Sequence, residues 1–225
     1  MKYRLKRKAL VLDHDDTVVA STLSVHYPAF VKAMEVFRPQ VTPLSLSEFQ
    51  SMNLDPGLDD YYREVLKMSE QEKAQEYKLW RSFADQILPE AYEDIHSILL
   101  QFQAAGGLIF VSSLNHANVI YRDYQRLFPS VILSDVFCAD QHSDLVKPNP
   151  EQLLYIMKKY RLQAKDLLMV DDLHYGLDMA KAAGVDFAYA QYSQINENNH
   201  KYFKQHAQII LEKPSELKKH ILVKV

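Results

Sequence analysis

The sequence of 225 residues contains little cysteine and little glycine. Its one cysteine, Cys138, cannot form an intramolecular disulfide, which indicates a reducing compartment, and its apolar surroundings predict a buried thiol. The five glycines form neither G-x-G-x-x-G nor a P-loop motif. A glycine-rich cradle for nucleotide phosphates is therefore excluded, and any phosphate must be bound by side chains, a metal ion or other backbone amides.

The chain also lacks an excess of positive charge and a long apolar run near its start. Lys and Arg number 26 against 29 Asp and Glu, so no basic field favours nucleic acid as a partner. The first apolar run, "ALVL", is too short for a signal peptide or a membrane span. We therefore expect a cytoplasmic protein that acts without a membrane or nucleic-acid partner.

Short apolar runs alternate with helical patterns over most of the chain, and 48% of the residues are apolar, enough to fill a core. Strand followed by helix, repeated, is typical of a parallel sheet with helices on both faces. The sequence thus predicts an α/β fold with a Rossmann-like sheet. The predicted strands are residues 8–13, 108–113, 135–139, 167–172, 186–190 and 207–211.

One region departs from this alternation. Residues 22–89 contain no buried-strand run, and their apolar residues recur at helical spacing between prolines. We therefore predict a core domain made of residues 1–21 and 90–225 and an inserted helical cap domain at 22–89. Because the insert begins just after the first strand, it can cover that end of the sheet.

Carboxylates cluster where predicted strands end. Asp13 and Asp15 follow the first strand, and Asp171 and Asp172 end another. In an extended segment Asp13 and Asp15 point the same way and His14 points the other way. Such carboxylates repel one another unless a cation relieves them. Mg²⁺ prefers oxygen ligands and often takes one or two carboxylates, which Asp13 and Asp172 could supply.

Four features in order resemble the haloacid dehalogenase-like hydrolase superfamily. They are the pattern hhhhDxDxT ending at Thr17, a serine after the second strand of the core, Lys147 before a helix, and the acidic pair Asp171–Asp172. The helical insert after the first motif resembles the cap of subfamily I. Each motif alone is weak, but the four together at their expected places on strands and helices are specific.

The resemblance implies a role for each of these residues. Asp13 would be the nucleophile and Asp15 the general acid/base, which also offers its backbone carbonyl to the metal. The phosphate would be bound by Ser112, Ser113 and Lys147, and Mg²⁺ by Asp13, Asp15 and Asp172, with Thr17 and Asp171 supporting the site. We expect Asp171 to position Lys147.

Other residues have a structural interpretation. The chain departs from a common family pattern at Gly176, where a second carboxylate often follows the first, and this leaves the last hydrogen bonds of the metal site open. His116 and His174 are interpreted as polar residues at helix starts. Trp80 and the pair Tyr61–Tyr62 lie on helical patterns and are predicted to pack in a core.

The resulting hypothesis is a Mg²⁺-dependent phosphatase that hydrolyses a small phosphorylated metabolite through an aspartyl-phosphate. The substrate could be a sugar phosphate, a phosphoglycolate-like acid or a nucleotide, and the oligomeric state stays open. A phosphomutase of the β-phosphoglucomutase type is the main alternative. Dehalogenase chemistry is disfavoured because Asp15 and Thr17 suit phosphate. A phosphoaspartyl receiver is disfavoured because Lys147 precedes the pair Asp171–Asp172 and the chain is too long.

Overall fold

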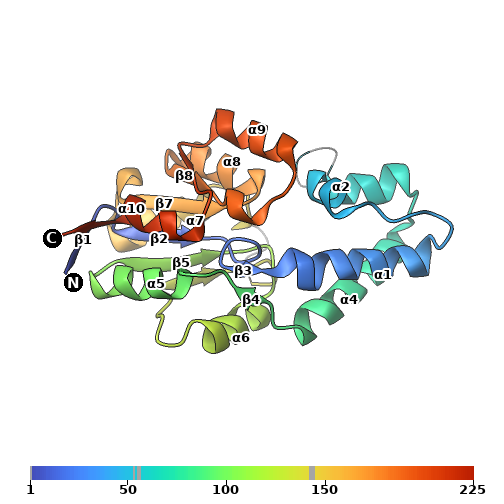
Figure 1. The fold of residues 1–225 in the computed structure, drawn as a ribbon, viewed down its shortest axis with the longest axis horizontal. Coiled ribbons are helices and arrows are strands. Elements are labelled where there is room, and N and C mark those ends of the chain that lie inside the picture. The colour runs from blue at the N-terminus through green and yellow to red at the C-terminus, as the bar shows by residue number, and fades with distance from the viewer. Residues whose placement is uncertain (1, 53, 55–56, 142–144) are drawn as a thin grey trace.

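A computed structural model of the chain describes residues 2–52, 54, 57–141 and 145–225. Its centre is a parallel sheet of six strands in the order β6-β5-β2-β7-β8-β9, which confirms the predicted α/β fold (Figure 1). The strands are continuous apolar runs because both faces of the sheet are covered. They are β2 (Ala9–Leu12), β5 (Leu108–Ser112), β6 (Asp135–Phe137), β7 (Leu167–Asp171), β8 (Asp186–Tyr189) and β9 (Ile209–Ile210).

Alternate residues of each strand pack on opposite faces of the sheet. In β2, Leu10 and Leu12 belong to one apolar core, which also contains Cys138, whereas Ala9 and Val11 belong to the other. Each fully buried aliphatic side chain contributes about 1.5–3 kcal/mol to folding. The first core is covered by α5 (Ile95–Ala104), α6 (Ala117–Leu127) and α10 (Leu217–Ile221), and the second by α7 (Glu151–Tyr160), α8 (His174–Ala183) and α9 (Glu197–His206).

Several short elements were not predicted from the sequence. They include α9, α10 and two antiparallel strand pairs, of which one joins the two ends of the chain at the edge of the molecule opposite the insert (Figure 1). Among the described residues, no helix is both long and apolar enough to cross a bilayer. The strand pairs are β1 (Tyr3–Leu5) with β10 (Leu222–Lys224) and β3 (Val19–Ala20) with β4 (Glu90–Ala91), and 3-10 turns span Ala164–Asp166, Gln191–Ser193 and Pro214–Glu216.

The insert between β3 and β4 is helical in its described part and lies beyond the carboxyl ends of the central strands (Figure 1). It has its own apolar cluster, which includes Phe30, Phe49 and Tyr62. The division of the chain at residues 21/22 and 89/90 stays a prediction about domains. The elements of the insert are two π-helical turns, Thr22–His26 and Tyr61–Val65, with α1 (Tyr27–Phe37), α2 (Leu46–Ser51), α3 (Leu58–Asp60) and α4 (Glu70–Gln86).

Arg38, just after α1, connects the end of this helix to the start of α4 through hydrogen bonds. Its guanidinium donates to both carboxylate oxygens of Glu72, at 2.8 and 3.3 Å, and to the backbone carbonyls of Leu66 and Lys67. Glu72 also accepts from the backbone amide of Ser69, which closes a capping box at the start of α4. Hydrogen bonds from Arg38 and Ser69 lower the pKa of Glu72 from 4.5 to about 2.

This lowered pKa predicts a pH-dependent stability. A carboxylate with a lower pKa in the folded state stabilises the fold above its unfolded pKa, and the contribution is lost as the pH falls toward its folded pKa. Glu72→Gln keeps the capping box but removes the charge. We expect its melting temperature to lie below that of wild type at pH 6, with a difference that shrinks between pH 5 and pH 3. A difference that stays constant over this range would contradict the assignment.

Gly176, in the first turn of α8, lies directly against Asp171 at the end of β7. A Cβ atom at position 176 would fall 2.2 Å from Asp171 Oδ2 and 2.6 Å from Asp171 Cβ. Asp171 cannot turn aside easily, because one of its carboxylate oxygens accepts from the backbone amide of Leu173 and the other from Lys147. The position therefore requires glycine because the neighbouring side chain occupies the space.

A double-mutant cycle tests this contact. Gly176→Ala should lower the free energy of unfolding by about 1–3 kcal/mol, because the new methyl group overlaps the carboxylate. In an Asp171→Gly background the same change should be neutral or stabilising, because alanine is the better helix former by about 0.5–1 kcal/mol. Urea titrations of the four proteins measure the coupling. Equal effects of Gly176→Ala in both backgrounds would show that the contact does not matter.

Candidate active site

The predicted site residues meet at the carboxyl edge of the sheet. Asp13 follows β2, Ser113 follows β5, and Asp172 follows β7. These three strands are neighbours, so the loops that follow them lie side by side. Asp13 and Asp172 are buried, with relative exposures of 4% and 3%, so their charges are poorly solvated.

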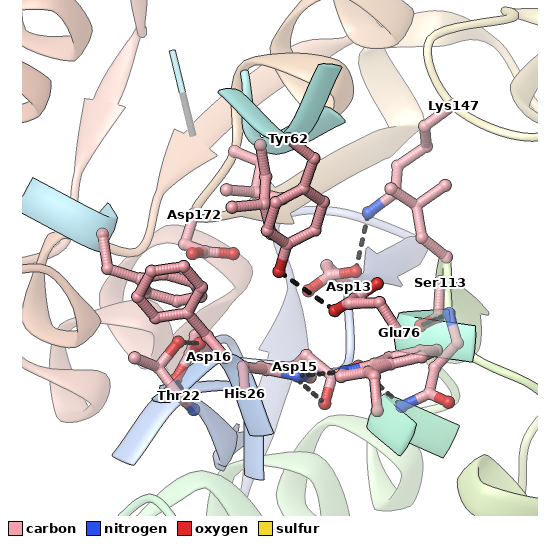
Figure 2. Close-up of a pocket in the computed structure, with 17 residues that line it drawn as sticks. Asp13, Asp15, Asp16, Thr22, His26, Tyr62, Glu76, Ser113, Lys147 and Asp172 are labelled. Carbon is pink, nitrogen blue, oxygen red and sulfur yellow. Dashed lines mark hydrogen bonds and ion pairs between the residues drawn. The ribbon is translucent and has the colours of Figure 1, made fainter. Parts of the chain in front are cut away.

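Lys147 lies between two of the carboxylates. Its Nζ atom is 2.6 Å from Asp13 Oδ1, a contact that Figure 2 shows, and 2.6 Å from Asp171 Oδ2. All three side chains are buried. Burial raises the pKa of Asp13 to about 7, while the ammonium of Lys147 acts in the opposite direction. Asp171 and Asp13 in turn raise the pKa of Lys147 against the effect of its burial, so the lysine is charged. Asp171 thus contacts Lys147, as expected from the sequence.

The carboxylates of Asp13, Asp171 and Asp172 form a group that could hold a metal. Each offers one oxygen atom, and these atoms lie within 4.8 Å of one another. Burial and the charges of Asp16, Asp171 and Asp13 raise the pKa of Asp172 well above its usual range, and the ammonium of Lys147 opposes this only in part. An all-carboxylate set fits Mg²⁺, a hard cation with a preference for oxygen. Both carboxylate oxygens of Asp171 are engaged, one by Lys147 and the other by the backbone amide of Leu173, whereas Lys147 contacts Oδ1 of Asp13. Asp13 and Asp172 are therefore the better pair of candidate ligands.

Asp172 is held by a chain of buried amides that the sequence analysis did not find. Gln194 Nε2 donates to Asp172 Oδ2 at 2.6 Å, and Gln194 Oε1 accepts from Asn199 Nδ2 at 3.3 Å. The same amide nitrogen of Asn199 donates to the backbone carbonyl of Gln50, in α2 of the insert, at 3.0 Å. The candidate metal ligand is thereby connected to the insert.

The side chain of Asp15 lies outside this carboxylate group. Its Oδ1 is 3.3 Å from His26 Nε2, and its Oδ2 accepts from Asn115 Nδ2 at 3.0 Å. Burial acts against its charge, but His26 and Asn115 hold the pKa of Asp15 well below its usual range. The expected metal contact of Asp15 was through its backbone carbonyl, and that contact stays a prediction.

Two adjacent residues of α4 orient the groups that contact Asp15. Trp80 Nε1 donates to His26 Nδ1 at 2.9 Å, and Arg81 donates to Asn115 Oδ1 at 2.9 Å. An indole N–H is only a donor, so His26 Nδ1 is the acceptor and the proton of the neutral ring lies on Nε2, toward Asp15. The orientation of Asp15 therefore depends on how α4 of the insert is placed.

His14 points away from the site, as the alternation along the segment predicts. Its Nε2 is 3.0 Å from Asp123 Oδ2 in α6, and both side chains are fully buried. Asp16 has a left-handed backbone, with φ of 56°, and its carboxylate accepts from the backbone amide and the hydroxyl of Thr22. Asp16 thus joins the loop after β2 to the first turn of the insert.

The two predicted phosphate-binding serines have different surroundings. Ser112 is the last residue of β5, and its hydroxyl donates to Gln152 Oε1 at 2.5 Å in the second core. Ser113 faces the cavity, because successive strand residues point to opposite sides. The structure therefore brings Ser113 to the site in place of Ser112. Thr17 is buried, and its backbone carbonyl accepts from the hydroxyl of Tyr192.

A cavity of about 300 Å³ lies between this edge of the sheet and the insert. Asp13, Asp15, Lys147 and Asp172 line its base, as Figure 2 shows. The opposite wall comes from the insert and includes two aromatic residues that the sequence analysis interpreted as core. Tyr62 and Trp80 both line the cavity, although Tyr62 is also part of the apolar cluster of the insert.

A family model described as haloacid dehalogenase-like hydrolase matches residues 10–190. No curated protein sequence matches the chain. Solved structures match it well in fold at low identity, and 221 chains do so in all.

Three of these structures illustrate the likeness. A predicted phosphoglycolate phosphatase from Haemophilus somnus has a TM-score of 0.75 at 16% identity, covering 95% of this chain and 97% of the other. A haloacid dehalogenase-like family hydrolase from Streptococcus pneumoniae has a TM-score of 0.73 at 12% identity, covering 96% and 98%. A mutant of CbbY from Rhodobacter sphaeroides, in complex with xylulose-(1,5)bisphosphate, has a TM-score of 0.69 at 16% identity, covering 94% and 96%.

The family match spans β2 from Leu10 onward, the insert, the loop that carries Lys147, and β7, which Asp172 follows. The solved structures agree with it in fold over nearly the whole chain. The chain therefore belongs to the haloacid dehalogenase-like hydrolases.

Proposed function

We propose that this hydrolase is a Mg²⁺-dependent phosphatase that acts on a small phosphomonoester. The observation that carries the proposal is the contact of Lys147 with Asp13 at the base of the cavity. It places a fixed positive charge beside a buried carboxylate that can attack phosphorus. Phosphoryl transfer requires mainly that the group is positioned and that its oxygens are neutralised.

Asp13 and Asp172 would hold Mg²⁺, with the backbone carbonyl of Asp15. When bound, the ion neutralises the carboxylates and polarises the phosphoryl oxygens. The fit of these residues to such an ion follows from their burial and from the proximity of their oxygens. The hydrogen bond from Gln194 leaves the second carboxylate oxygen of Asp172 available as a ligand.

The residues of the chain account for each step of hydrolysis. Asp13 attacks phosphorus and forms an aspartyl-phosphate as the bond to the leaving alcohol breaks. Lys147 and Ser113 bind the phosphoryl oxygens. Asp15 donates a proton to the leaving oxygen and then takes one from the water that attacks the intermediate. The negative charge of a bound phosphate raises the pKa of Asp15, which favours its acid form in the first step.

The similar structures support a small phosphorylated substrate. One is described as a predicted phosphoglycolate phosphatase, and another contains a sugar bisphosphate. The cavity volume of about 300 Å³ is at the lower end of the range for small-molecule sites.

The nucleophile can be tested by substitution. Asp13→Asn should lower turnover of p-nitrophenyl phosphate by about a thousandfold or more, because no covalent intermediate forms. Circular dichroism should show an intact fold. Asp178→Asn, an exposed residue of α8, is the matched control and should keep wild-type activity. Turnover by Asp13→Asn above about a tenth of wild type would refute the assignment. If the wild-type protein converts a sugar phosphate into an isomer without releasing inorganic phosphate, it is a mutase instead.

The metal can be tested by stability as well as by activity. EDTA should abolish turnover and Mg²⁺ restore it, and Mg²⁺ should raise the melting temperature of the wild-type protein, since a ligand at a hundred times its Kd stabilises by about 2.7 kcal/mol.

The effect of Asp172→Asn on the melting temperature should differ between the metal-free protein and the protein with Mg²⁺. Without metal it should raise the melting temperature, because one of several repelling carboxylates is neutralised. Addition of Mg²⁺ should not raise the melting temperature of this variant further, because one ligand of the ion is lost. Differential scanning calorimetry in EDTA and in Mg²⁺ gives both values. A Mg²⁺-dependent rise in this variant as large as in wild type would exclude Asp172 as a ligand.

A further inference from the structure

The wall of the cavity that comes from the insert is aromatic and carries one acidic group. Phe30, Tyr62 and Trp80 line this wall, and Glu76 of α4 is half-buried among them (Figure 2). Tyr62 donates its hydroxyl hydrogen to Glu76 Oε1 at 3.0 Å. The carboxyl group of Glu76 therefore lines the insert side of the cavity, toward which the leaving group of a substrate held at Asp13 and Lys147 would extend.

Glu76 has no ion-pair partner in the part of the chain that the structure describes. The neighbouring cations are bound elsewhere: Lys73 pairs with Asp59 and Glu70, and Arg81 pairs with Asp85. Burial raises the pKa of Glu76, and the hydrogen bond from Tyr62 opposes this only in part. A half-buried carboxylate in this setting gains from a positive charge brought by a ligand.

The described residues of the insert that line the cavity include no lysine or arginine. Residues 53, 55 and 56, which lie outside the described part, are Asn, Asp and Pro and so add no basic group. Among all described residues that line the cavity, Lys147 is the one lysine or arginine. It is bound to Asp13 and Asp171. His26 also lines the cavity, but its two ring nitrogens are engaged by Asp15 and Trp80. A carboxylate or a second phosphate on the leaving group would therefore be placed near Glu76 without a free cation to compensate it, which is costly.

The polar groups on the same wall are already engaged. Trp80 donates to one nitrogen of His26, and the other nitrogen faces Asp15. Thr22 donates its hydroxyl hydrogen to Asp16. Few hydrogen-bonding groups are thus left for a leaving group with many hydroxyls. A cation, in contrast, is bound well by a carboxylate together with aromatic rings.

We propose that the substrate is a small phosphomonoester whose alcohol carries an ammonium group, and that Glu76 binds this group beside Tyr62 and Trp80. The inference rests on the proposed phosphatase function of the same cavity. Hydrolysis of such a substrate breaks the bond between phosphorus and the leaving oxygen, consumes one water, and releases the amino alcohol and inorganic phosphate. Lys147 and Ser113 bind one end of the substrate and Glu76 the other.

Three phosphomonoesters of similar size test the sign of the charge. They are phosphocholine, its neutral carbon isostere 3,3-dimethylbutyl phosphate, and phosphoglycolate, with p-nitrophenyl phosphate as a general substrate. With Mg²⁺ and the wild-type protein, kcat/KM for phosphocholine should exceed that for the isostere by about tenfold, the size expected for a cation among aromatic rings and a carboxylate. Phosphoglycolate should be the poorest of the three.

Two variants identify Glu76 as the origin of the preference. Glu76→Gln can still accept from Tyr62 but carries no charge, so the ratio of kcat/KM between phosphocholine and its isostere should fall close to one, mainly through KM. Glu70→Gln, on the exposed side of the same helix, should keep the wild-type ratio. In the Asp13→Asn background, which cannot turn over, calorimetric titration with phosphocholine should show weaker binding when Glu76→Gln is added.

The outcomes separate this inference from the proposed function. If p-nitrophenyl phosphate is hydrolysed but the isostere or phosphoglycolate is preferred over phosphocholine, the ammonium assignment is overturned and the phosphatase assignment stands. If Glu76→Gln keeps the wild-type ratio, Glu76 is not the binding group. If none of the four esters is hydrolysed in the presence of Mg²⁺, both proposals fail.

Discussion

The ammonium of Lys147, buried between two carboxylates, is the interaction on which the rest of the site depends. The backbone leading from the sheet brings several like charges to one edge, and without a cation their repulsion would be strongly destabilising. Lys147 contacts Asp13 and Asp171, so it joins the loop before α7 to the ends of β2 and β7. Lys147 forms its ion pairs with Asp13 and Asp171 and not with Asp172. The negative charge of Asp172 could therefore be compensated by a metal ion that these carboxylates bind.

A second constraint is that the insert is linked by hydrogen bonds to two carboxylates of the candidate site, Asp15 and Asp172. On one side, Trp80 and Arg81 of α4 act on Asp15 through His26 and Asn115. On the other, Gln50 of α2 is linked to Asp172 through buried amides. Breaking buried hydrogen bonds of this kind is costly, because the separated groups are left without a partner away from water. The position of the insert and the geometry of the core site are therefore coupled, since moving one breaks hydrogen bonds in the other.

The sheet and the acidic residues were predictable from the sequence for a local reason. Buried parallel strands are continuous apolar runs, and Asp13 and Asp172 directly follow two of them. Both Ser112 and Ser113 were named as phosphate-binding residues, but a difference of one residue at a strand end reverses the direction of the side chain, and Ser113 is the one that lines the cavity. Trp80 and Tyr62 were interpreted as core residues because an aromatic stripe on a helix has the same spacing whether it faces a core or a cavity.

Other features had no local signal at all. Gln194 and Asn199 belong to a polar segment with no periodic pattern, and only the fold brings them to Asp172. The pairing of β1 with β10 joins the two ends of the chain, and each strand has only three residues. Pairing at such a separation depends on the closure of the whole domain, which a pass along the sequence cannot show.

The close approach of Gly176 to Asp171 also constrains how this chain can diverge. While an aspartate stands at position 171, every side chain at position 176 meets it, so replacing the glycine first costs more stability than replacing it after the aspartate is lost. Loss of the aspartate in turn leaves Lys147 with one carboxylate partner among the described residues instead of two. The less costly order of substitutions in descendants of this sequence therefore loses the aspartate first, and it passes through an intermediate whose lysine is less firmly held.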